Sequence, residues 1–125
     1  MAGKQVLSVG QCGADHGGIA RALRQVFGAE VVAAHSSAEA LQQMRHGEFA
    51  LVLVNRVLDA DGSAGLDLVR AVKEDEALRR VPVMLVSNYE DAQEEAVAAG
   101  AEPGFGKAAL GRPEMLGRVQ PFLGG

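Results

Sequence analysis

Short apolar runs alternate along this chain with longer segments in which apolar residues recur every three or four positions. Short runs bounded by Gly, Pro, Asn or Ser are typical of buried strands, and the longer periodic segments are typical of amphipathic helices. The alternation repeats five times. The predicted strands cover residues 5–10, 30–35, 49–55, 81–87 and 102–107. The predicted helices cover residues 19–27, 36–47, 65–75, 90–100 and 112–123.

Residues at the ends of these segments support the helix boundaries. Ser36 and Glu39 have the spacing of a capping box at a helix start. Pro113 falls in the first turn of the last helix, where its missing N–H is tolerated. Three glycines lie at or just past the ends of predicted helices, where a left-handed residue is favoured: Gly28, Gly47 and Gly100.

The order of the elements predicts an α/β protein with a parallel sheet between two layers of helices. Strands that alternate with helices pair in parallel through right-handed crossovers. The nearly continuous aliphatic runs at 49–55 and 81–87 suit strands covered on both faces. All 125 residues are expected to form a single domain, 1–125. Ligands in such folds bind at the carboxyl ends of the strands, so the residues after each strand are the candidates for chemistry.

Composition excludes several classes of function. A net charge of −4, four Phe, one Tyr and no Trp argue against nucleic acid as a partner. The apolar runs are far shorter than the roughly 18 residues of a membrane span, so we expect no membrane association. The single Cys excludes an internal disulfide and a site of several thiolates. The N-terminus has no leader pattern, and we expect a cytoplasmic protein.

Two stretches resemble the receiver domain of bacterial response regulators. In "PVMLVSNYEDAQEEAVAAGAEPGFGKAAL" a strand ends in Ser87, a helix and Gly100-Ala101 follow, and Lys107 lies seven residues past the Gly. In "GEFALVLVNRVLDADGSAGLDLVRAVKED" Asn55 stands where a receiver has its phospho-accepting Asp. The resemblance implies a flavodoxin-like three-layer α/β/α sandwich, with five parallel strands in the order 2-1-3-4-5. It also implies a role in two-component signal transduction.

The departures from the receiver pattern remove its chemistry. A receiver needs a carboxylate to attack the phosphoryl group and an acidic pair to hold Mg²⁺. This chain has Asn55 at the first position and Gly10 and Gln11 at the pair. A carboxamide is not a competent nucleophile here, and the three residues offer Mg²⁺ no negative charge. We therefore predict a pseudo-receiver that is not an enzyme, binds Mg²⁺ weakly or not at all, and acts through protein–protein interaction.

The resemblance also assigns the remaining receiver positions. Ser87 and Lys107 match residues that bind the phosphoryl group in receivers. We expect Lys107 to hydrogen-bond the Asn55 amide oxygen, with contact to an anion as the alternative, and Ser87 to bond to the backbone. Gly104 falls where receivers have an aromatic switch residue, and Phe105 follows it, which argues against an aromatic readout. The family's interaction face, formed by the fourth helix, fifth strand and fifth helix, corresponds here to about residues 90–122.

Other acids offer an alternative to the lost acceptor. Asp59 or Asp61, after the third strand, could act as a displaced phospho-acceptor. The simpler interpretation of "DADG" is a solvated turn, in which Asp and Gly are common. Asp15 could replace a metal carboxylate, but it lies where we expect the first helix to be capped. His35 and His46 have no evident carboxylate or Cys partner in the sequence.

The stretch "GQCGADHGG", residues 10–18, suggests a third function as an anion- or ligand-binding loop. A glycine-rich loop between a strand and a helix can present N–H groups to a phosphate. The stretch matches neither G-x-G-x-x-G nor a GK[ST] ending. No Arg follows Cys12 closely enough for thiol phosphatase chemistry, so we expect a small, partly buried residue. The candidate loop residues are Cys12, Gly13, Gly17 and Gly18.

Overall fold

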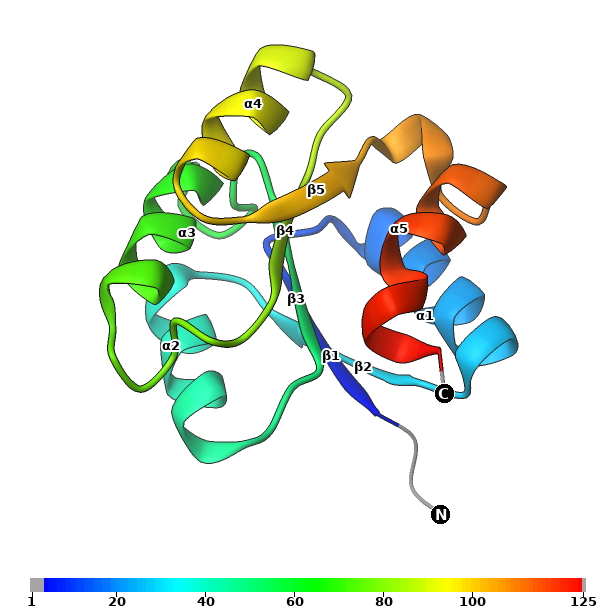
Figure 1. Ribbon diagram of the computed structural model, residues 1–125, viewed down its shortest axis with the longest axis horizontal. Coiled ribbons are helices and arrows are strands. Elements are labelled where there is room, and N and C mark those ends of the chain that lie inside the picture. The colour runs from blue at the N-terminus through cyan, green and yellow to red at the C-terminus, as the bar shows by residue number, and fades with distance from the viewer. Residues whose placement is uncertain (1–3, 125) are drawn as a thin grey trace.

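A five-stranded parallel sheet forms the centre of the protein, in the order β2-β1-β3-β4-β5. The computed structural model, shown in Figure 1, describes residues 4–124. The strands are β1 (Gln5–Val9), β2 (Glu30–Ala34), β3 (Leu51–Asn55), β4 (Val83–Val86) and β5 (Glu102–Phe105). The helices are α1 (Gly13–Phe27), α2 (Ser37–His46), α3 (Gly65–Glu74), α4 (Glu90–Ala98) and α5 (Pro113–Leu123), with a 3-10 turn, η1 (Lys107–Ala109), after β5. The predicted fold class and strand order are confirmed.

Helices cover both faces of the sheet, because the central strands are apolar on both sides. All five residues of β3 are buried. Leu51 and Leu53 contribute to the core on one face, where α1 and α5 pack, and Val52 and Val54 contribute to the core on the other face, under α2, α3 and α4. Figure 1 shows these two helical layers on opposite sides of the sheet.

Helix α1 begins at Gly13, whereas the sequence predicted a loop up to residue 18. Glycine weakens a helix by about 1 kcal/mol relative to Ala, which favoured the loop interpretation. Residues 13–18 extend the part of α1 that buries Ile19 and Leu23 in the core, and adding turns to a helix that is already nucleated costs little. Cys12 is the N-cap, and its Sγ accepts a hydrogen bond from the Asp15 N–H at 3.5 Å. The prediction of Asp15 as the cap is therefore wrong.

The other predicted helix ends agree with the structure in all but one case. Gly28 and Gly100 have positive φ angles of 65° and 111°, as predicted. Gly47 has a φ of −136°, which is extended, so the prediction of a left-handed residue there is wrong. Ser36 Oγ accepts a hydrogen bond from the Glu39 N–H at 3.2 Å, and Pro113 opens α5.

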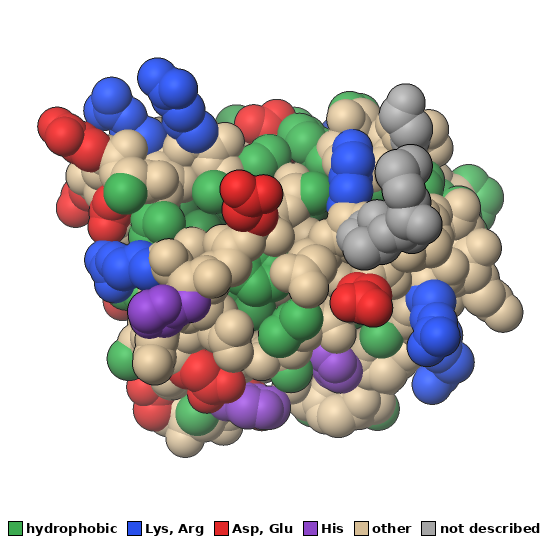
Figure 2. Space-filling model, turned by 90° about the horizontal axis from the view of Figure 1, so that it is seen from below, with side chains coloured by type: hydrophobic (Ala, Val, Ile, Leu, Met, Phe, Trp, Pro, Cys, Tyr) green, Lys and Arg blue, Asp and Glu red, His purple; other side chains and the backbone are tan. Residues whose placement is uncertain are grey.

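The outer surface carries charges of both signs. On the face drawn in Figure 2, acidic and basic side chains are interspersed, and hydrophobic side chains lie between them in small groups. Within residues 4–124, no helix is both long and apolar enough to cross a bilayer.

Candidate functional site

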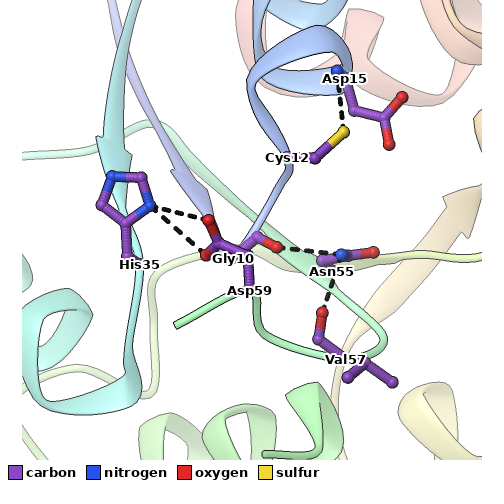
Figure 3. Close-up of polar contacts among 7 residues, drawn as sticks. All are labelled: Gly10, Cys12, Asp15, His35, Asn55, Val57 and Asp59. Carbon is purple, nitrogen blue, oxygen red and sulfur yellow. Dashed lines mark hydrogen bonds and ion pairs between the residues drawn. The ribbon is translucent and has the colours of Figure 1, made fainter. Parts of the chain in front are cut away.

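Asn55 ties together the ends of two neighbouring strands. Because β1 and β3 pair in parallel with Val9 beside Val54, the residues that follow them meet at one edge of the sheet. The Asn55 side-chain amide donates to the carbonyl oxygens of Gly10, at 3.0 Å, and Val57, at 2.8 Å (Figure 3). Its Oδ1 accepts from the Arg56 N–H at 3.1 Å. Asn55 is only 8% exposed, and both donors of its carboxamide are satisfied by backbone.

Leu58 closes the space at the end of β1. It is buried and lies over Gly10, which has a φ of +71°. A Cβ on Gly10 would lie 2.8 Å from Leu58 Cα and even closer to the Leu58 side chain. No residue with a side chain fits there unless the loop after β3 moves. The space beside Gly10 is therefore filled by the buried side chain of Leu58.

Lys107 pairs with Asp15. Its Nζ lies 3.0 Å from Asp15 Oδ2, with the two side chains 40% and 22% exposed. The hydrogen bonds found for the Asn55 carboxamide run to Gly10, Val57 and Arg56, and none runs to Lys107. The predicted Lys107–Asn55 clamp is therefore wrong. Instead, this lysine joins η1 to the first turn of α1.

The residues present do not fit the divalent metal that the receiver resemblance implies. The Gly10 carbonyl already accepts from Asn55 Nδ2 and from the Asp59 N–H at 3.2 Å. Gln11 is 3% exposed, and its amide nitrogen and oxygen have no hydrogen-bond partner among the described residues. Within residues 4–124, no three His, Cys, Asp or Glu side chains are grouped as metal ligands. Asp15, the closest substitute in sequence, is engaged by Lys107.

Asp59 and Asp61 lie in the loop between β3 and α3 and are held there by neighbours. The Asp59 carboxylate is 3.1 Å from His35 Nδ1, so the expectation that His35 lacks a carboxylate partner is wrong. Asp61 Oδ1 accepts from the Ser63 N–H at 2.9 Å and from its hydroxyl at 2.6 Å. These hydrogen bonds from Ser63 lower the pKa of the exposed Asp61 carboxyl. Gly62, at φ +71°, completes a turn of the expected kind.

Ser87 bonds to the backbone, as predicted. It is 5% exposed, and its Oγ accepts from the Tyr89 N–H at 3.1 Å. Tyr89 projects outward, with the Arg56 guanidinium carbon 4.7 Å from the centre of its ring. Asn55 and Ser87 both resemble active positions of a receiver in the sequence. Asn55 accepts a hydrogen bond from the backbone N–H of Arg56, and Ser87 accepts one from that of Tyr89.

The pairing of β4 and β5 is irregular, because its register shifts between Met84 and Val86. The side chain of Gln93, from α4, lies at this irregular seam. Its Nε2 donates to Leu85 O at 2.8 Å and Ser87 O at 3.1 Å. Its Oε1 accepts from the Gly104 N–H at 3.2 Å. A Cβ on Gly104 would approach Leu85 O and lie 2.9 Å from Gln93 Oε1.

These contacts explain why a glycine is needed at position 104. Gly104 leaves room for Gln93, and Phe105 is 2% exposed in the core under α1 and α5. Gln93 was not among the candidate residues predicted from the sequence. It could have been recognised as a polar residue on the inward side of α4, three positions before the buried Ala96.

The predicted anion-binding loop is not a loop. Gly13, Gly17 and Gly18 all lie within α1. Cys12 is exposed, so the prediction of a partly buried residue is wrong, and its thiol serves as the helix cap.

Comparison with solved structures shows which proteins share this fold. A protein from Chloroflexus aurantiacus described as a response regulator superposes with a TM-score of 0.86 at 24% identity, covering 97% of this chain and 98% of that one. A response regulator from Thermotoga maritima gives 0.80 at 24% identity, covering 98% and 99%. The chemotaxis response regulator CheY4 of Vibrio cholerae gives 0.77 at 21% identity, covering 97% and 99%. No protein-family model and no curated protein matches the sequence. The chain has the fold of response-regulator receiver domains.

Proposed function

We propose that this protein is a pseudo-receiver, a signalling module in a two-component pathway that works through protein–protein interaction without being phosphorylated. The arrangement at Asn55 carries the proposal. Its carboxamide donates to two backbone carbonyls, and Leu58 fills the space beside Gly10. The position of the acceptor has become part of the internal structure.

The proposed interaction surface is formed by α4, β5 and α5, within residues 90–122. A groove of about 810 Å³ lies there between α4 and α5. Glu90 and Glu94 line it from α4, and Arg112 and Arg118 from the α5 side. Val97, which is 44% exposed, offers an apolar contact at its edge. A groove with apolar and charged side chains suits a protein partner.

The Gln93 bridge supports a fixed surface. Four backbone groups, three of them in β4 and β5 and the fourth in Ser87 directly after β4, converge on the side chain of Gln93, so α4 is attached directly to the sheet. A receiver that signals by a population shift needs two arrangements of this region. In this protein, the bridge favours one of them.

The alternative function is a receiver that is phosphorylated on Asp59 or Asp61. One experiment distinguishes it from a pseudo-receiver. The protein is incubated with acetyl phosphate and Mg²⁺, and its intact mass is measured. We expect no phosphate adduct. A stoichiometric adduct would overturn the proposal, and its loss in Asp59→Asn or Asp61→Asn would identify the acceptor.

A further inference from the structure

A second groove lies on the other side of α4, between that helix and the loop joining β3 to α3. Its volume is about 530 Å³. Asp91, Ala92 and Glu95 line it from α4, whereas the groove between α4 and α5 is lined by Glu90, Gln93 and Glu94. We call the second one the lateral groove. It lies on the opposite side of α4 from the groove of the α4–β5–α5 surface.

The lateral groove is apolar in its inner part and along its exposed edge. Leu66, Leu85 and Ala92 line its inner part. Val57 and Tyr89 form its edge, which we call the lip, and are 40% and 59% exposed. Exposed large apolar side chains that gather at one concave site mark interaction surfaces, whereas scattered ones do not. Aromatic residues at such a lip supply a large contact area.

The lip is held in place before any partner binds. Asn55 Oδ1 fixes the Arg56 N–H, and Ser87 Oγ fixes the Tyr89 N–H. The Arg56 guanidinium then stacks over the Tyr89 ring, 4.7 Å from its centre. A preformed lip reduces the entropy lost on binding. The former active-site positions therefore support the lateral groove structurally.

The charges around the lateral groove select the partner. Asp91 and Glu95 are exposed and lie one helical turn apart on its rim. Helix α4 contains four acidic residues and no basic residue. Arg56 is the basic residue of the lining, and its guanidinium stacks on Tyr89 without losing its charge. The two carboxylates outweigh this one positive charge, so the net charge of the rim is negative.

We propose that the lateral groove docks a protein segment that presents an aliphatic side chain flanked by Lys or Arg. The aliphatic side chain enters between Val57 and Tyr89, and the basic residues pair with Asp91 and Glu95. Opposite charges at such a rim steer association and fix the register of the bound segment. This surface is additional to the α4–β5–α5 surface of the proposed function.

The test is a titration of the full ¹⁵N-labelled chain with two acetylated probe peptides, one made of Leu and Lys and one with Glu in place of every Lys. We expect saturable amide shifts at Val57, Leu66, Tyr89 and Ala92 with the Lys peptide and none with the Glu peptide. The double variant Asp91→Lys/Glu95→Lys should weaken binding about tenfold or more. Tyr89→Ala, which leaves the charges intact, should weaken it as well.

The matched control is Glu90→Lys/Glu94→Lys, which makes the same charge change on the other side of the same helix. It should retain most of the affinity, because its residues line the groove between α4 and α5. Shifts confined to that groove, or equal losses in both double variants, would overturn the inference and leave the proposed function standing. Absence of saturable binding, or burial of the lateral groove against a second copy of the chain in solution, would also overturn it.

Discussion

Lys107 Nζ lies 3.0 Å from Asp15 Oδ2, and this ion pair joins the turn after β5 to the first turn of α1. The lysine that resembles the phosphoryl-binding residue of receivers therefore has a structural partner. Asn55 and Ser87 also have structural partners, since the Asn55 amide donates to backbone and the Ser87 hydroxyl accepts from the Tyr89 N–H. All three side chains hold backbone segments together.

Replacing Lys107 by Met should have a small effect on stability. The pair is partly exposed, so screening by solvent limits its contribution to about 0.2–1 kcal/mol. Urea unfolding should give similar losses for Lys107→Met and Asp15→Asn, and a double variant less destabilised than the sum of the two. A fully additive double variant would show that the pair contributes nothing.

Asn55→Asp should destabilise the protein at neutral pH. A carboxylate there would face the carbonyl oxygens of Gly10 and Val57 with no hydrogen to donate. We expect a loss of roughly 1–3 kcal/mol in the free energy of unfolding. The loss should become smaller as the pH falls and the carboxyl is protonated, since one O–H donor returns. Asn55→Ala is the control, and its deficit should not depend on pH in this way.

Introducing an acid at residue 10 should also destabilise the protein. Gly10→Ala would hold a non-glycine residue in the left-handed conformation, which lowers the free energy of unfolding by roughly 1–2 kcal/mol. The added Cβ would also collide with Leu58. Gly10→Asp adds a charge to the same crowded space. In Gly10→Asp/Asn55→Asp, millimolar Mg²⁺ should not raise the melting temperature. A clear rise would show that the loop after β3 can move away to form a metal site.

Gln93→Ala should release α4 from the sheet. The substitution leaves the Gly104 N–H and the Leu85 carbonyl without their side-chain partner, at a cost of roughly 1–3 kcal/mol. Hydrogen exchange at the Gly104 amide should become faster. Glu94→Ala, an exposed change in the same helix, should leave that exchange rate unchanged. An unaltered rate in Gln93→Ala would count against the bridge.

Asp75 should make stability depend on pH at the acidic end. Hydrogen bonds from the Ala77 N–H and then from Arg45 lower the pKa of its carboxyl below 3.8. Because the folded-state pKa is depressed, the stabilisation is present above about pH 3.8 and is lost as the pH falls through the lower folded value. Asp75→Asn should therefore reduce the difference between melting temperatures at pH 6 and below about pH 3. Asp67→Asn, on the exposed side of α3, serves as the control.

The sequence identified the fold because its apolar pattern reflects burial directly. The runs at 49–55 and 81–87 are mostly aliphatic, and their central parts, β3 and β4, are buried at every residue, as expected of strands covered on both faces. The start of α1 was missed because glycine content measures local preference, whereas residues 13–18 extend a helix already nucleated by the packing of Ile19 and Leu23. The edge strand β5, with Pro103 and Gly104, was found from its place in the order of elements.

By itself, the sequence determined that the chain folds as a five-stranded α/β sandwich, and its resemblance to receivers led us to expect Asn55, Gly10 and Gln11 at the positions of their acids. Only the tertiary structure decided the partner of each polar side chain. Lys107 pairs with Asp15, His35 with Asp59, and Gln93 with the β4–β5 seam. The reason is that periodicity reports which residues are buried, but a hydrogen bond depends on distances and angles between segments far apart in the chain. Those distances exist only once the helices are packed on the sheet.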